Sequence, residues 1–537
     1  NGFLAKTMGA ELPAAPGSRI YVTTDFSDVT QRMRAGTDAM TPNERYDAID
    51  QRAKDITAEC EKEAGYRCRV ASYYGGDWMV PRPPGDFSFY RAYVAPDGSS
   101  AEYSEDNVPY KAEHFLKVSK SGLDEGDFVM VAGYPGSTSR YAMLAEVENT
   151  FGWEYPTFQK LLTDWIGTIE AAAPEGSDAR VKYEARLAGL NNYEKNLRGQ
   201  IEGARRVGLI ERRREREAAL ADWIAADPSR AAYGPAIDNL AELSQESATA
   251  ARTSFWYGNA TRAQLLSVAQ RLYRLAKERE KPNAQRESGY QERDMAFFRQ
   301  GLQALDRRYD PSVDKAEWEL FLNGYLAQPQ AERVAVFDNA LGLTGVDDAK
   351  QLDAILNGYY ANTSLDESET RLALMDASVA DLEASDDPFM KLAIALYDYE
   401  RGLEDEAEER AGRGLALRPA YMEAITQWQS EQGMLPYPDA NSTLRITYGN
   451  VMGGSPFDGM EYLPFTTLEG ITQKDTGIDP FNAPARELAL IEAKDYGQYE
   501  LDSIGSVPVN FLTDKNQRDP ISDQTNFKSL LCRVSKA

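Results

Sequence analysis

The stretch TFQKLLTDWIGTIEAA at residues 157–172 marks the point where the character of the sequence changes. Its large apolar side chains recur at spacings of three and four, namely Phe158, Leu161, Leu162, Trp165, Ile166 and Ile169. This spacing places them on one face of a helix. Similar patterns continue to about residue 416, separated by breaks rich in Pro or Asp such as AAPEGSD and SDDP. Because no fixed repeat period is visible, they predict a helical domain rather than a solenoid.

The segments on both sides of this helical block have the composition of β-strands. Before it lie SRIYVTTDF (18–26), FSFYRAYV (87–94) and DFVMVAGYPGS (127–137), and after it STLRITYGNV (442–451), EYLPFTTLEG (461–470) and SIGSVPVNFLTD (503–514). Only residues 41–63, opened by Thr41-Pro42, look helical in the first part. The order β, long α, β predicts a β domain interrupted by a helical insertion.

The charge and hydropathy of the chain restrict the kinds of molecule that it is expected to bind. The chain has 59 Lys and Arg against 85 Asp and Glu, a net charge of −26. A surface this acidic repels phosphate backbones, so we expect no nucleic acid partner. No apolar run reaches the roughly 18 residues of a membrane span, so we expect no membrane insertion. The chain opens with Asn1 and shows no signal peptide, so we expect a processed protein or part of a longer one.

Three cysteines and one histidine bear on covalent and metal chemistry. Cys60 and Cys68 lie in AECEKEAGYRCR, joined by a short polar loop that suits a disulfide formed in an oxidising compartment. The alternative to this disulfide is that Cys60 and Cys68 are two unrelated buried thiols. Cys532 has no predicted partner in either case. With one histidine and no Cys-x-x-Cys pair, we expect no metal site and no cofactor.

A few polar residues suggest chemistry, each with a simpler structural alternative. His114, in PYKAEHFLKV, is a possible general base or a structural histidine beside a strand. Asp86 ends the Pro-rich bend WMVPRPPGD, where it would orient a catalytic histidine or only form a turn. Asn191 and Asn192, in NNYEKN, would bind a peptide's amine or carbonyl or only mark a turn between helices.

Several stretches taken together resemble one family. They are YVTTDFSDVT (21–30), ECEKEAGYRCR (59–69), WMVPRPPGDFSFYRAYV (78–94), DFVMVAGYPGSTSRY (127–141), LPYPDANSTLRITYGNVMG (435–453) and IGSVPVNFLTD (504–514). In this order they are similar to the bacterial dipeptidyl-peptidases of serine peptidase family 46, the group that holds dipeptidyl-peptidases seven and eleven. The likeness runs from about residue 1 to about residue 514.

The resemblance implies an α+β multidomain fold: a chymotrypsin-like double β-barrel with a large inserted all-α domain. Residues 1–150 would form one β-barrel part, 151–436 the α-helical cap, and 437–514 the second β-barrel part. The tail 515–537 stays unassigned, because KNQRDPISDQTNFKSLLCRVSKA resembles nothing in the family.

The resemblance also implies an activity. Family members are serine-type dipeptidyl aminopeptidases, which release dipeptides from the free N-terminus of oligopeptides through an acyl-enzyme. They work in the periplasm or at the cell surface, usually as homodimers, without metal. We therefore expect oligopeptide substrates, a homodimer and an exported bacterial enzyme.

Residues can be carried over where motifs match. Asp86 corresponds to the aspartate of the catalytic triad, and Trp78 to the aromatic near the substrate's amino end. Asp77 stands where the family usually has Asn, and a carboxylate there would pair with an ammonium. Asn192, with Asn191 as the second choice, corresponds to the helical-domain asparagine that binds the substrate's N-terminus.

The sequence also departs from the family pattern around the active site. It contains neither the Thr-Asn-His-His-Cys run nor the Gly-Gly-Asn-Ser-Gly-Ser-Pro run, and Ser522 and Ser529 lack a Gly-x-Ser-Gly context. The junction between Gly76 and Asp77 is short, as if a loop were cut out. Two hypotheses follow: an active peptidase whose catalytic segments lie outside this sequence, or a catalytically inactive relative that binds peptide N-termini. The preference for acidic or hydrophobic side chains at the cut stays open.

Overall fold

The structure is a computed structural model. It describes residues 29–37, 39–62, 67–68, 70, 91–101, 104–112, 117, 122–346, 348–434, 436, 439–440, 442, 445–457, 459–477 and 482–514. The chain divides into two compact units. Unit 1 comprises Asn1–Val22, Ala71–Tyr141 and Gln429–Ala537, and unit 2 comprises Thr23–Val70 and Ala142–Trp428.

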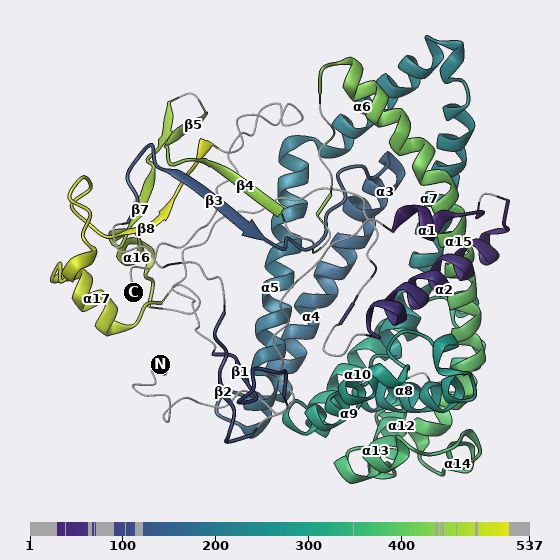
Figure 1. The fold of residues 1–537 in the computed structure, drawn as a ribbon. Coiled ribbons are helices and arrows are strands. Elements are labelled where there is room, and N and C mark those ends of the chain that lie inside the picture. The colour runs from purple at the N-terminus through teal and green to yellow at the C-terminus, as the bar shows by residue number, and fades with distance from the viewer. Residues whose placement is uncertain are drawn as a thin grey trace. The chain divides into compact units, whose positions relative to one another are not determined.

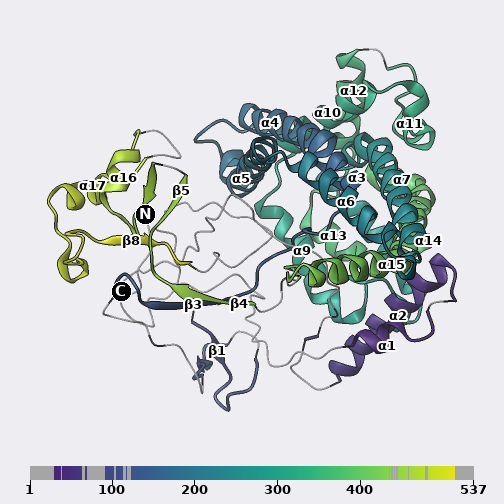
Figure 2. The same ribbon diagram turned by 90° about the horizontal axis from the view of Figure 1, so that it is seen from above.

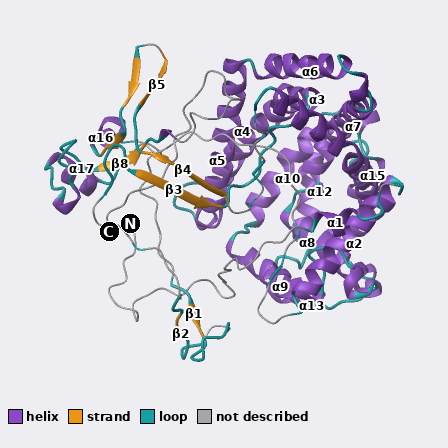
Figure 3. Cartoon of the chain, turned by 45° about the horizontal axis from the view of Figure 1, so that its top comes forward, coloured by secondary structure: helices purple, strands orange, loops and turns teal. Residues whose placement is uncertain are grey.

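Unit 2 is built from helices, drawn as coiled ribbons in Figure 1 and coloured purple in Figure 3. Its first members are α1 (Thr30–Arg34), α2 (Pro42–Cys60), α3 (Leu144–Asn149), α4 (Tyr155–Ala172), α5 (Asp178–Val207), α6 (Leu209–Ala225) and α7 (Tyr233–Ala260). They are followed by α8 (Gln264–Arg279), α9 (Met295–Ala304), α10 (Pro311–Leu326), α11 (Ala335–Leu341), α12 (Ala349–Ala361), α13 (Ser368–Leu374) and α14 (Val379–Glu383). The long helix α15 (Pro388–Glu431) leads out of the unit. The helical insertion predicted from the periodicity of apolar residues is thus present.

Local sequence explains where these helices begin and end. The Thr41 hydroxyl accepts the N–H of Glu44 and the Glu44 carboxylate accepts the N–H of Thr41, which is a capping box at the start of α2. Ser177 caps α5 in a similar way, by accepting the N–H of Arg180 at 3.1 Å. Gly208 then adopts φ 62°, a left-handed conformation that suits glycine and lets the chain turn into α6.

Helices α4, α5 and α10 pack against one another through the apolar face recognised in the sequence. Leu162 and Ile169 of α4, Tyr183 of α5 and Phe321 of α10 are almost fully buried in this contact. A larger core continues through the later helices around Trp318, whose indole N–H donates to the carbonyl of Ala260 at 2.7 Å. Close packing on this scale makes unit 2 a rigid support for any site on its surface.

Helices α1 and α2 also belong to unit 2, although they precede the insertion in the sequence. Arg45 of α2 is buried, and its guanidinium donates to the carbonyls of Thr37 and Gly412, each at 3.2 Å. The interpretation of residues 1–150 as one β-barrel part did not foresee this placement.

The described part of unit 1 contains short strands, two small α-helices and a single 3-10 turn at Gly497–Tyr499. The strands are β1 (Tyr93–Val94), β2 (Val108–Pro109), β3 (Phe128–Gly133), β4 (Arg445–Asn450), β5 (Gly454–Phe457), β6 (Met460–Tyr462), β7 (Phe465–Thr467) and β8 (Pro508–Phe511). The helices are α16 (Glu469–Lys474) and α17 (Ala485–Glu492). Strands β3 and β4 come from opposite sides of the insertion yet pair in antiparallel register, with Met130 opposite Tyr448 (Figure 2).

The described strands form four two-stranded antiparallel sheets: β1 with β2, β3 with β4, β5 with β6, and β7 with β8. Val451, Phe465 of β7 and Phe511 of β8 form a small apolar core, against which Val129 of β3 also packs. Segments before and after the helical insertion therefore share unit 1, as the β–α–β order predicted. Two closed barrels are not seen among the described residues, so the double β-barrel is not confirmed. Within the same residues, no helix is both long and apolar enough to cross a membrane.

Candidate functional site

The two neighbouring asparagines of α5 lie in different environments. The Asn191 side chain is half-buried, and its Nδ2 donates to the carbonyl of Leu187 at 3.0 Å. The Asn192 side chain is exposed and makes no hydrogen bond with any described residue. Helix α5 runs without a break through both residues, so the alternative that they mark a turn between helices is wrong. A ligand on this surface would therefore meet the free amide of Asn192.

Next to Asn192, contacts between α4 and α5 fix the local surface. The ring of Tyr193 meets the ring of Phe158 edge-on, with centroids 5.6 Å apart. Gln159 Nε2 donates to Glu194 Oε1 at 2.8 Å on the adjoining turn. A polar side chain held on a packed helix pair is positioned more closely than one on a loop.

One and a half turns earlier, α5 takes part in a buried polar network around Glu317 of α10. The indole N–H of Trp165 donates to Glu317 Oε1, and Arg186 Nη2 lies 3.1 Å from the same oxygen. Burial raises the pKa of Glu317 to about 7, against the opposing effects of Arg186 and Trp165. The neighbouring carboxylate of Asp314 is also buried; it accepts the N–H of Gln264 at 2.9 Å and the hydroxyl of Tyr360 at 2.7 Å.

Cys60 at the end of α2 forms a disulfide with Cys68, with Cα atoms 6.2 Å apart. The pairing favoured by the spacing is thus present. The backbone N–H of Cys68 donates to Glu61 Oε1 at 2.8 Å, and Glu61 pairs with Arg293 at 2.9 Å. The disulfide therefore closes a loop that is also tied to the segment before α9.

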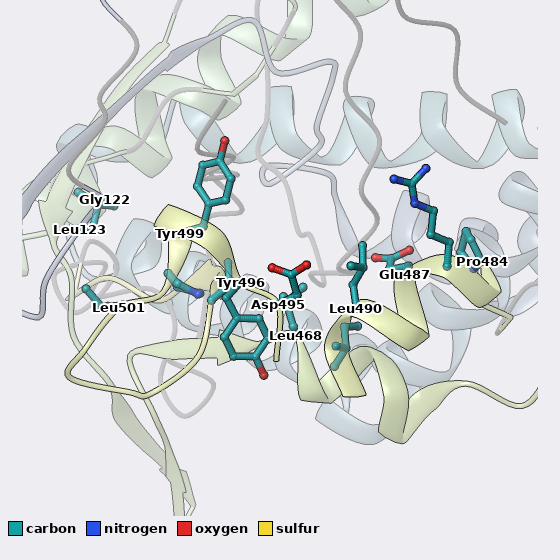
Figure 4. A pocket seen from close by; sticks show the side chains of 14 residues that line it. Gly122, Leu123, Leu468, Pro484, Glu487, Leu490, Asp495, Tyr496, Tyr499 and Leu501 are labelled. Carbon is teal, nitrogen blue, oxygen red and sulfur yellow. The ribbon is translucent and has the colours of Figure 1, made fainter. Parts of the chain in front are cut away.

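Unit 1 has a cavity of about 480 Å³ that the sequence did not reveal (Figure 4). Its lining is mostly apolar and comes from Gly122, Leu123, Leu468, Pro484, Arg486, Glu487, Leu490, Ile491, Asp495, Tyr496, Tyr499, Leu501, Val507 and Pro508. Beside it, Glu469 accepts the hydroxyls of Tyr496 at 2.5 Å and Ser506 at 2.6 Å. These bonds lower the pKa of Glu469 to about 2, Ser506 having the largest effect.

A family model described as Peptidase S46 matches residues 1–77 and 76–518 of the chain. The chain belongs to the peptidase S46 family. The two matched segments meet at residues 76–77, which is the junction that the sequence analysis described as short. The family suggested by the sequence motifs is thereby confirmed.

Curated S46 relatives match along nearly the whole chain. The chain is 37% identical over 565 residues to the Asp/Glu-specific dipeptidyl-peptidase of Shewanella putrefaciens, covering 95% of this chain and 76% of the relative. It is 26% identical over 567 residues to dipeptidyl-peptidase 7 of Porphyromonas gingivalis, covering 98% and 77% respectively.

Solved S46 structures share the fold. The crystal structure of Porphyromonas endodontalis DPP11 in complex with the dipeptide Arg-Glu matches with a TM-score of 0.68 at 22% identity, over 90% of this chain and 73% of that one. The same protein in complex with substrate matches with a TM-score of 0.65, over 95% and 77%. At this identity the likeness establishes the fold and not the role of any residue.

The remaining S46 site predictions fall on residues that the structure does not describe. Asp86, Asp77, Trp78 and His114 lie outside the described residues, so their assigned roles stay predictions. Among the described residues, no group of three or more His, Cys, Asp or Glu side chains is arranged to hold a metal ion. The network around Glu317 could not be predicted from the sequence, because nothing in the local pattern distinguishes Glu317 from an exposed helical glutamate.

Proposed function

We propose that this S46 chain is a serine-type dipeptidyl aminopeptidase that releases dipeptides from the free N-terminus of oligopeptides. The observation that carries the proposal is its 37% identity, over 95% of its length, to a relative named Asp/Glu-specific dipeptidyl-peptidase. Another matched relative is named dipeptidyl-peptidase 7, so the side chain preferred at the cut is best determined with a peptide series.

In this proposal Asp86 orients the catalytic histidine and stabilises its imidazolium form. Asp77 and Trp78 receive the amino end of the substrate, with a carboxylate facing the ammonium group. Asn192 binds the same amine from the helical unit. Its exposed and unbonded amide supports this role, and the engaged amide of Asn191 argues against the second choice. Binding the free amine at a fixed distance from the cut is what would limit the product to a dipeptide.

The proposal extends to the architecture and setting of the molecule. Strands β3 to β8 would belong to a chymotrypsin-like double β-barrel. Its two parts would be residues 1–150, except for the segments that belong to unit 2, and residues 437–514, with 151–436 as the helical cap. The disulfide between Cys60 and Cys68 supports an oxidising compartment, hence the periplasm or the cell surface. We also propose a homodimer, as is usual in the family.

A second candidate function is capture of peptide N-termini without catalysis. The sequence contains one histidine, His114, which lies outside any Thr-Asn-His-His-Cys run, and no Gly-Gly-Asn-Ser-Gly-Ser-Pro run. A protein without a serine and a histidine in a triad forms no acyl-enzyme. Asp77, Trp78 and Asn192 would still suffice to bind an ammonium group.

Two measurements on the purified protein separate these functions. The first is labelling by a serine-directed dipeptidyl phosphonate, followed by intact-mass analysis. The second is mass-spectrometric detection of dipeptides released from one peptide with a free N-terminus and from its N-acetylated form. Labelling together with release from the free form only supports the peptidase. Tight binding of the free form without labelling or release overturns the peptidase in favour of peptide capture.

A further inference from the structure

Arg262 is a cation that has no carboxylate partner among the described residues of this strongly acidic protein. It lies between α7 and α8, and its guanidinium forms no ion pair or hydrogen bond with any described residue. The chain carries 85 acidic against 59 basic side chains. Some arginines of unit 2 are paired, for example Arg413 with Glu246 at 2.8 Å and Arg186 with Glu317 at 3.1 Å, whereas others, such as Arg308, have no ion pair among the described residues. Arg262 is of interest because of its position, which lies close to the surface around Asn192.

Aromatic side chains of α4 hold the Arg262 guanidinium in place. Its Cζ lies 6.0 Å from the ring centroid of Phe158 and 5.9 Å from that of Trp165. Contacts of this kind orient an arginine and leave its five N–H donors available. The residue as a whole remains exposed, so those donors can be reached from solvent.

The same aromatic pair connects Arg262 to the surface around Asn192. Phe158 contacts the ring of Tyr193, the residue that follows Asn192 in α5. Trp165 in turn carries the guanidinium of Arg186, at 5.1 Å from its ring. Arg262, Phe158 and Tyr193 thus form one continuous surface next to Asn192, and all of them lie within unit 2.

The electrostatics of this surface favour an anion. Partial desolvation against the two rings lowers the pKa of Arg262, and repulsion by Arg186 lowers it further. The charge of Arg186 is already offset by Glu317, whereas Arg262 has no counter-charge among the described residues. A ligand carboxylate would offset the desolvation of Arg262 and its repulsion by Arg186. A guanidinium can bind such a carboxylate through two parallel N–H donors.

We propose that Arg262 binds the side-chain carboxylate of an acidic residue at the N-terminus of the peptide substrate. The inference rests on the proposed function, because it takes Asn192 as the residue that binds the amine of that same substrate residue. Arg262 then selects for Glu or Asp at the first position, and it has no part in choosing the second residue, after which the chain is cut.

Calorimetric titration of the full chain with dipeptide amides tests this directly, since the amide removes the C-terminal carboxylate. The ligands are Glu-Leu-amide, its neutral isostere Gln-Leu-amide, and Leu-Glu-amide. We expect Arg262→Gln to weaken Glu-Leu-amide about 10-fold or more, as for a lost charge-assisted hydrogen bond. The other two ligands should change less than about 2-fold, since neither places a carboxylate at Arg262. Arg262→Lys should restore part of the affinity because it keeps the charge.

Arg413→Gln is the matched control, because Arg413 has its own carboxylate partners, and circular dichroism checks that each variant is folded. Equal weakening of all three ligands by Arg262→Gln would mean a structural role and would overturn the proposal. An unchanged affinity for Glu-Leu-amide in the Arg262→Gln variant would also overturn the proposal. The same holds if Glu-Leu-amide does not bind the unmodified chain, or if the variant loses affinity for Leu-Glu-amide alone.

N-acetyl-Glu-Leu-amide distinguishes failure of this inference from failure of the proposed function. If the acetylated ligand binds as well as the free one and still depends on Arg262, the carboxylate contact stands and the amine contact is wrong. If the free ligand is preferred but does not respond to Arg262→Gln, the amine contact stands and the Arg262 contact is wrong.

Discussion

The indole N–H of Trp165 in α4 donates to the carboxylate of Glu317 in α10, and both side chains are at least 95% buried, Trp165 with 5% and Glu317 with 2% of its surface exposed. Arg186 of α5 reaches the same carboxylate oxygen. One acidic group thus joins α10 to α4 and α5, the two helices that carry Phe158, Tyr193 and Asn192 of the candidate substrate surface. The other oxygen of Glu317 has no hydrogen-bond partner among the described residues, so the group is buried at a cost.

This arrangement predicts a pH-dependent stability that Glu317→Gln removes. The pKa of Glu317 is raised to about 7 in the folded protein, above its ordinary value of 4.5. A raised pKa means that the protonated form favours folding below pH 4.5, and that this contribution is lost as the pH rises toward 7. The glutamine variant keeps a neutral group throughout. Between pH 4.5 and 8 we expect the unmodified chain to lose about 3 kcal/mol relative to this variant.

Urea unfolding at four pH values across that range provides the measurement. Glu211→Gln, at an exposed position on α6, is the control and should give a curve parallel to that of the unmodified chain. Parallel curves for the Glu317 variant as well would show that Glu317 stays charged throughout and would contradict the prediction.

The sequence revealed the helical unit because its evidence is local. The recurrence of Leu161, Leu162 and Trp165 is visible in one window, and it reports the face that α4 buries. The Glu317 network is different, because Trp165 and Glu317 are separated by 152 positions. Which glutamate of α10 faces Trp165 depends on how the helices pack, and no pattern within one helix contains that information.

The same reasoning explains the other differences. Helix α2 was predicted from its cap, but its membership of unit 2 reflects contacts between residues far apart in sequence, such as the bond between Arg45 and Gly412, 367 positions apart. Asn191 and Asn192 are equivalent as letters, and they differ only because a helix turns them toward different surroundings. Nothing in the sequence around Arg262 predicted a role for it, because that role is inferred from its lack of an ion-pair partner among the described residues.

The disulfide between Cys60 and Cys68 should stabilise unit 2 by a modest amount. Their separation in sequence is 8 residues, and closing so short a loop restricts the unfolded chain by about 2–3 kcal/mol. The double variant Cys60→Ser/Cys68→Ser should lose this much in urea unfolding, and the unmodified protein should lose the same amount under reducing conditions. The double variant itself should not respond to the reductant. A response in that variant, which keeps only Cys532, would point to a disulfide between two copies of the chain.

Glu469 should make unit 1 sensitive to acid. Its pKa is lowered to about 2, chiefly by Ser506 and then by Tyr496. A lowered pKa gives a contribution to stability that is present above pH 4.5 and lost as the pH falls toward 2. Glu469→Gln should therefore flatten the dependence of the melting temperature on pH between 4.5 and 2, and Tyr496→Phe should flatten it partly. Differential scanning calorimetry of the three proteins gives the comparison, and identical slopes would exclude Glu469 as the group responsible.

Asn192 and Asn191 form a matched pair for testing substrate binding. Because the Asn192 amide is exposed and has no hydrogen-bond partner among the described residues, Asn192→Ala should leave the melting temperature unchanged. It should raise KM about 10-fold or more for peptides with a free N-terminus, since a hydrogen bond to a charged group is lost. Asn191→Ala removes only the bond to the Leu187 carbonyl within α5, so KM should stay within about 2-fold. If Asn191→Ala alone raises KM, the helix presents the other amide to the substrate. If neither variant does, the amine of the substrate is held entirely by unit 1.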